Sequence, residues 1–117
     1  MEKPIIKEYA DGTKEWWLNG LLHREDGPAI EFPSGSKEWY LFGKRHRKNG
    51  PAVEHHSGYK GWWLFGKKHR EDGPAIEWPD GTKLWYLDGE EVTEQKVMNR
   101  YFTKDIKNAF NDIIKEL

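Results

Sequence analysis

The 117-residue sequence predicts a mainly β fold: an antiparallel β-hairpin repeat meander forming a single elongated sheet, with a C-terminal α-helical segment. Two observations predict it. Residues 20–88 are three gapless copies of a 23-residue unit with strand-like patterns. Residues 93–117 contain no Gly or Pro, and their apolar residues recur at threes and fours. We therefore expect a repeat sheet over 1–92 and an amphipathic helix over 93–117.

Each repeat is expected to form one β-hairpin. Its first strand is rich in aromatic residues and free of Gly and Pro, as in residues 14–18 (KEWWL). A second strand follows each Gly-Pro pair, as in residues 29–32. The dipeptides Asn19-Gly20 and Asp88-Gly89 favour two-residue hairpin turns, because both central residues of such a turn need a positive φ angle. These signals predict about seven antiparallel strands.

The C-terminal helix is expected to begin at Thr93, whose hydroxyl can cap the first turn, with Glu94 favourable beside it. We expect its apolar face to pack on one side or end of the sheet and to cover apolar surface there. The alternative is a helix that binds a partner or a second copy. The protein is accordingly expected to be a monomer or a homodimer.

Composition and charge exclude several classes of function. The net charge of −1 provides no overall basic field for nucleic acid or anionic membrane. The absence of Cys excludes disulfides and thiolate chemistry. No stretch approaches the ~20 apolar residues of a membrane span, and the N-terminus does not resemble a signal peptide. We expect a soluble cytoplasmic protein with no membrane association.

The residues that are suited to chemistry repeat with the scaffold. His23, His46 and His69 would lie two strands apart, roughly 9.5 Å, which is too far for neighbours to share one zinc ion. Their expected role is to hold the Gly-Pro loops together with the adjacent arginines. No Ser or Cys stands in a nucleophile context. We expect no catalytic residue, no metal, no cofactor and no enzymatic activity.

A ladder of lysines runs beside the repeated Trp residues, at positions 14, 37, 60 and 83. One interpretation is a strip of cations and aromatic rings on which nucleotide bases could stack. The other is structural, with lysine stems lying over the Trp rings and their ammonium groups near the repeated Glu residues. The structural interpretation is favoured, because stacked identical hairpins produce such ladders without any ligand.

The central repeat departs most from the other two. Around positions 44–48, Lys48 replaces the acidic Glu25 and Glu71 of the other copies. Around positions 55–59, the polar His55 replaces Phe32 and Trp78. A binding surface is expected there. Its candidate residues are Lys44, Arg45, His46, Arg47, Lys48, His55, His56 and Tyr59. A thin sheet also leaves aromatic rings partly exposed, and these anchor interfaces. The candidate aromatic surface is Trp17, Tyr40, Trp63 and Tyr86.

The repeat signature reads Asn19-Gly20-x-x-His23-Arg24-x-x-Gly27-Pro28-Ala29-x-Glu31, then Gly35-x-Lys37-x-Trp39-Tyr40-Leu41. This motif resembles the MORN-variant (MORN-like, HREDGPA-type) repeat family, over about two-thirds of the chain. Such proteins are found in bacteria and phages, and some are described as antitoxin components. The resemblance implies stacked hairpins in a single-layer sheet.

The expected function is a non-enzymatic protein-interaction module that binds and blocks another macromolecule. The resemblance implies an antitoxin or a phage inhibitor of a bacterial defence system, in the cytoplasm of a bacterium or of the infected host cell. The alternative is a protein that sequesters a nucleotide or short nucleic acid by Trp stacking with Lys and Arg. Another protein is the expected partner.

Overall fold

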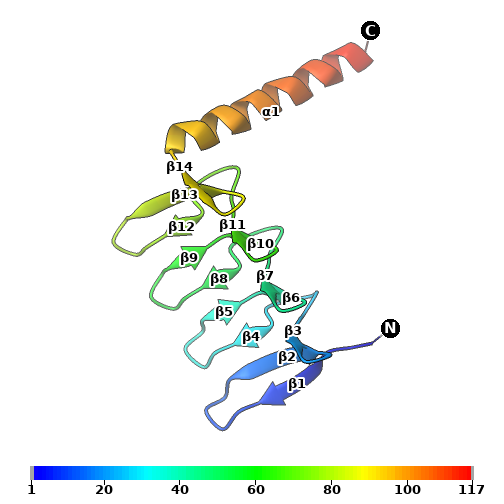
Figure 1. The fold of residues 1–117 in the computed structure, drawn as a ribbon, viewed down its shortest axis with the longest axis vertical. Helices are drawn as coiled ribbons and strands as arrows, with labels where there is room; N and C mark the ends of the chain where they lie inside the picture. Colours follow the sequence, from blue (N-terminus) through cyan, green and yellow to red (C-terminus); the bar gives the residue numbers. More distant parts are fainter. Residues whose placement is uncertain (1, 117) are drawn as a thin grey trace.

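The computed structural model describes residues 2–116, which form a thin, elongated stack of hairpins ending in one long helix (Figure 1). The described chain measures 59 × 41 × 21 Å, and its radius of gyration is 17.5 Å. A compact domain of this length would have a radius of gyration of about 13 Å. The mainly β, antiparallel prediction is confirmed.

Fourteen short strands lie within residues 2–116, and every pairing is antiparallel. The strands are β1 (Ile5–Glu8), β2 (Lys14–Leu18), β3 (Leu21–Leu22), β4 (Ile30–Glu31), β5 (Lys37–Glu38), β6 (Tyr40–Leu41), β7 (Lys44–Arg45), β8 (Val53–Glu54), β9 (Lys60–Gly61), β10 (Trp63–Leu64), β11 (Lys67–Lys68), β12 (Ile76–Glu77), β13 (Lys83–Leu87) and β14 (Glu90–Val92). The main sheet has the order β1-β2-β4-β5-β8-β9-β12-β13-β14, with β3 beside β2. The pairs β6–β7 and β10–β11 stand apart from it.

The strands are shorter and more numerous than expected because each aromatic strand changes partner halfway along. The first half of β2 pairs with β4, and its second half pairs with β3. In the two central repeats the same change breaks the strand, at Trp39 between β5 and β6 and at Trp62 between β9 and β10. The stack therefore consists of two rows of hairpins. The first row is the main-sheet pairs β4–β5, β8–β9 and β12–β13. The second row is the pairs β2–β3, β6–β7, β10–β11 and β13–β14, which contain the second halves of the aromatic strands.

The turns of the second row have the expected geometry. Asn19 and Gly20 have φ angles of 51° and 79°, and Asp88 and Gly89 have φ angles of 51° and 85°. Positive φ at both central residues is the property of a type I′ turn, whose twist matches that of the flanking strands. The prediction of two-residue turns at these dipeptides is confirmed.

The buried core is small and runs as a line through the stack. Ala29, Ala52 and Ala75 of the Gly-Pro-Ala segments are fully buried, with Ile30 and Ile76 beside them in sequence. The alanine backbones also link neighbouring strands: Ala29 donates to the Glu38 carbonyl at 2.8 Å. A small side chain at this position lets successive hairpins stack closely.

Charged residues of opposite sign face each other across eight strands of the main sheet. The order across the sheet is Glu8, Lys14, Glu31, Lys37, Glu54, Lys60, Glu77 and Lys83. Opposite charges directly across a strand pair are favourable, and a slip of one residue would put them on the other face. This row helps to set the register of the stack.

The helix α1 (Glu94–Lys115) does not lie on the sheet, and the expectation that it would is wrong beyond its first turn. Thr93 caps it by accepting a hydrogen bond from the Lys96 amide at 3.2 Å. Val97 is fully buried and α1 contacts β13, but residues 99–116 are exposed. Thr93 alone separates β14 from α1, so no loop turns the helix back, and it leads away from the stack (Figure 1).

Candidate functional site

The histidine of each His-Arg pair holds the hairpin turn at the end of its own repeat copy. Its Nδ1 atom accepts a hydrogen bond of 2.9–3.0 Å from an amide 19 residues later: His23 from Phe42, His46 from Phe65 and His69 from Asp88. Nδ1 accepts only when it is unprotonated, so the neutral ring carries its proton on Nε2. These bonds assign the histidines a structural role.

The arginine of each pair packs on the Trp ring that lies eight residues earlier in the chain. The guanidinium carbon lies 3.8–3.9 Å from the ring centroid: Arg24 over Trp16, Arg47 over Trp39 and Arg70 over Trp62. Each Nη1 also donates to a proline carbonyl at 3.1 Å and reaches a repeated Glu at 3.0–3.5 Å. The cation found over these rings is therefore arginine, where the sequence suggested the lysine stems.

The repeated histidines and carboxylates do not form a shared metal site. Within residues 2–116, no group of three or more His, Asp or Glu side chains lies close enough together to hold a metal ion. No helix in the same residues has the length and apolarity needed to cross a membrane.

The basic residues at 44–48 do not form one continuous patch. The Arg45 side chain donates to Glu38 at 3.2 Å and lies 5.2 Å from the Trp63 ring. His46 and Arg47 are held by the repeat contacts described above. Lys44 and Lys48 are the two exposed members. The cluster is split because successive residues of an extended chain point to opposite faces.

The second half of the predicted site lies at the other end of the repeat. His55, His56 and Tyr59 belong to the turn between β8 and β9, on the opposite side of the stack from β6–β7 and β10–β11 (Figure 1). The His55 Nδ1 atom lies 2.7 Å from Ser57 Oγ. Burial raises the pKa of Tyr59. The structure therefore does not bring residues 55–59 together with residues 44–48.

The four residues of the predicted aromatic surface are half-buried on one face of the stack. Basic side chains lie over their rings: Lys7 is 5.8 Å from Trp17, Arg45 is 5.9 Å from Tyr40, and Lys68 is 5.7 Å from Trp63 and 4.9 Å from Tyr86. The row is partly covered by the protein's own cations.

Because of Gly61, the Trp63 indole in this row lacks the hydrogen-bond acceptor that Trp17 has. In the first repeat, Trp17 Nε1 donates to Glu15 at 3.1 Å. Gly61 stands at the position equivalent to that glutamate in the central repeat, and a Cβ atom there would lie 3.1 Å from Trp63 Nε1. The buried Trp63 Nε1 atom consequently has no hydrogen-bond partner among the described residues.

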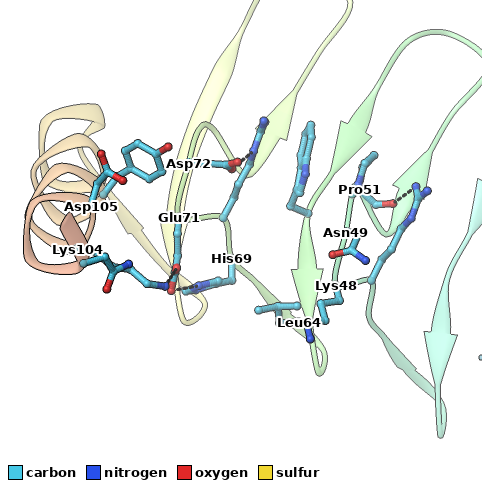
Figure 2. Close-up of a pocket in the computed structure, with 15 residues that line it drawn as sticks. Lys48, Asn49, Pro51, Leu64, His69, Glu71, Asp72, Lys104 and Asp105 are labelled. Carbon is cyan, nitrogen blue, oxygen red and sulfur yellow. Dashed lines mark hydrogen bonds and ion pairs between the residues drawn. The ribbon is translucent and has the colours of Figure 1, made fainter. Parts of the chain in front are cut away.

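An open groove of about 810 Å³ lies between α1 and the Gly-Pro loops of two repeats (Figure 2). Lys104 reaches from α1 to Glu71, with Nζ and Oε2 3.2 Å apart, and His69 Nε2 lies 3.4 Å from the same carboxylate. The Lys104 hydrogen bond lowers the pKa of Glu71. Glu71 is thus paired both with the helix and with its own loop, so this part of the groove is a contact between α1 and a Gly-Pro loop.

Phe42 and Phe65 stand out at the two turns that join the three repeat copies. Both have φ of 47°, in the left-handed region that Asn19 and Asp88 occupy in the outer turns. A bulky residue is an outlier there, whereas Asn and Asp are comparatively tolerated. The two phenylalanines are also 60% and 65% exposed. Backbone conformation and solvent exposure both favour a polar residue at these positions.

These rings belong to a wider surface along one side of the stack. The turns between β2 and β3, β6 and β7, and β10 and β11 lie one above another there (Figure 1). Five exposed side chains in these turns and at the starts of the strands that follow form what we call the phenylalanine edge: Leu21, Phe42, Lys44, Phe65 and Lys67. The rings of His23 and His46 pack behind the two phenylalanines, with centroids 4.2 and 4.0 Å apart, and hold them in place.

The fold and this edge define a β-hairpin repeat protein with a projecting helix. Comparison with models of protein families, with curated proteins and with solved structures found no match.

Proposed function

We propose that this protein is a non-enzymatic interaction module that binds another protein through the phenylalanine edge and blocks it. The observation that carries the proposal is the placement of Phe42 and Phe65, exposed and at left-handed backbone positions. Unfavourable backbone conformations concentrate at functional sites, and exposed aromatic groups anchor interfaces.

The edge favours a partner with a specific chemistry. Equivalent turns of neighbouring repeats are about 10 Å apart, two strand spacings, so the partner needs two apolar hollows at that separation. Lys44 and Lys67 are exposed beside the rings and favour acidic groups around those hollows. The histidines hold the rings in place before binding, which lowers the entropy cost of forming the complex.

The blocking role depends on the resemblance to MORN-variant repeat proteins of bacteria and phages. It makes the protein an antitoxin or a phage inhibitor of a bacterial defence system, acting in the cytoplasm of the bacterium or infected cell. A similarity of repeats is weaker support than a site, because one fold serves many functions.

Binding of a nucleotide or short nucleic acid remains the second candidate. The row of Trp17, Tyr40, Trp63 and Tyr86 beside basic residues supports it, but support is weaker because Arg45 and Lys68 already lie over the rings. The absorbance ratio at 260 and 280 nm of the purified chain tests it. A ratio explained by the protein alone counts against a tightly held nucleotide.

The proposal is tested by capture from a bacterial lysate with the full chain and with Phe42→Asn/Phe65→Asn. These substitutions install at both turns the residue that the first repeat carries at Asn19. Trp78→Asn is the matched control, because Trp78 is an exposed aromatic residue at the opposite turns. We expect one stoichiometric protein with the unmodified chain and the control, and its loss with the double variant. Equal capture by all three would contradict the proposal.

A further inference from the structure

One apolar face of α1 has no cover among the described residues. Its members, which we call the helix stripe, are Phe102, Ile106, Phe110, Ile113 and Ile114, each 49–68% exposed. At 100° per residue they occupy an arc of about 120° on the side opposite the buried Val97. Large exposed apolar patches on proteins mark sites of association.

The helix stripe faces away from the sheet. Tyr101, Lys104 and Asn108 lie on the opposite side of α1 and line the groove against the Gly-Pro loops. Figure 2 shows Lys104 directed from the helix toward Glu71. A second molecule can therefore approach the stripe without meeting the hairpin stack of the first.

Charged residues of opposite sign border the two sides of the stripe. Asp105 and Asp112 lie along one side, and Arg100 and Lys107 lie along the other. When two identical helices face each other in parallel, the acidic side of one meets the basic side of the other. In the antiparallel arrangement, acidic meets acidic and basic meets basic. Charge complementarity therefore selects the parallel pairing of two copies.

We propose that α1 pairs in parallel with α1 of a second copy of this chain, which makes the protein a two-fold symmetric dimer. The five stripe residues expose on the order of 500 Å² per copy, so pairing buries about 1,000 Å² in total, the lower bound for a specific interface. The two hairpin stacks then lie on the outer sides of the helix pair. The dimer does not depend on the proposed function, and it leaves both phenylalanine edges free.

The mass of the full chain in solution tests the dimer. Light scattering on a size-exclusion column should give 27.8 kDa, twice the 13.9 kDa of one chain. Ile106→Lys, at the centre of the stripe, should weaken self-association about 100-fold, because each dimer loses two buried isoleucines. Ile5→Lys is the control, since Ile5 is equally exposed on β1, and it should leave the dimer intact. A monomer at all concentrations, or a dimer insensitive to Ile106→Lys, would overturn the proposal.

The orientation is tested by a disulfide, since the chain has no cysteine of its own. In the parallel dimer, Ile113→Cys places two thiols opposite each other, and mild oxidation should link the two chains almost completely. Asn108→Cys places its thiols on the outer sides of the pair and should not cross-link. A dimer in which Ile113→Cys fails to cross-link, or in which Asn108→Cys cross-links equally well, would overturn the parallel arrangement.

Discussion

The Nδ1 atom of His23 accepts a 2.9 Å hydrogen bond from the Phe42 amide, and the two rings pack with centroids 4.2 Å apart. This contact joins the His-Arg segment of a repeat copy to the hairpin turn at the end of the same copy. The His46–Phe65 pair repeats both interactions, and His69 repeats the hydrogen bond at Asp88. The histidine of the repeat signature therefore supports the turn that carries the candidate interaction surface.

His23→Ala should destabilise the protein by about 1–3 kcal/mol, because it leaves the Phe42 amide without its partner and removes a ring contact. His23 is only 3% exposed. Urea denaturation measures the loss. His55→Ala, an exposed histidine, should change stability by less than about 0.5 kcal/mol. Equal effects of the two substitutions would refute the structural role of His23.

Stability should fall as the pH drops from about 6.5. Burial lowers the pKa of His46 from its ordinary value of 6.5. Between the lowered pKa of the folded chain and the ordinary pKa of the unfolded chain, the unfolded chain binds more protons, so acid favours unfolding. The loss of stability from His46 is complete below its pKa in the folded chain. The lowered pKa of Glu71 extends the loss to more acid pH. Urea midpoints at pH 8, 6.5 and 5 measure this dependence, which should be shallower in His46→Gln. A midpoint that rises toward acid would contradict the sign.

Gly73→Ala should destabilise the stack by about 1–3 kcal/mol, the usual cost of overpacking. A Cβ atom at Gly73 would lie 2.8 Å from the guanidinium carbon of Arg70 and push it off the Trp62 ring. A double-mutant cycle with Arg70→Ala separates this clash from a backbone effect. The substitution at Gly73 should cost much less once the guanidinium is absent. Additive effects would show that the arginine is not the cause.

Removal of residues 103–117 should leave the hairpin stack folded. Beyond Met98 the helix is exposed, and the Lys104–Glu71 ion pair lies at the surface, where such pairs contribute about 0–1 kcal/mol. Thermal unfolding of dilute protein measures the change, which should be a few degrees at most. Val97→Asp, by contrast, should destabilise strongly, because it buries a charge. Aggregation of the truncated chain would mean that the helix covers the sheet.

The repeat period, the antiparallel sheet and the turns at Asn19 and Asp88 could be predicted because they depend on local rules. A 23-residue repetition implies one structural unit per copy, and Gly after Asn or Asp implies a two-residue turn. The helix was also predictable from its spacing, but its placement was not. Whether it turns back over the sheet depends on the single residue between β14 and α1, whose direction no pattern encodes.

The candidate site was predicted less well, and for a physical reason. The charges of residues 44–48 predict one basic cluster. Side chains of an extended chain alternate between its two faces, however, so these residues do not form one patch. The sequence predicts arginines in the Gly-Pro loops and lysine stems over the Trp rings, whereas the structure has the arginines over those rings. The sequence itself shows the unusual residue choice that marks the phenylalanine edge, a bulky residue at a turn position that favours Asn or Asp. Phe42 and Phe65 stand before glycine where the outer repeats have Asn19 and Asp88.

The central claim is that Phe42 and Phe65 serve a partner and are not needed for the fold. The most direct measurement is the unfolding free energy of Phe42→Asn/Phe65→Asn by urea denaturation. Loss of the histidine ring contacts, about 0.5–1.5 kcal/mol each, is offset by the better fit of Asn to a left-handed backbone, so we predict a value within about 1 kcal/mol of the unmodified protein. A loss of about 3 kcal/mol or more would contradict the account, because it would make the two phenylalanines part of the stabilising structure.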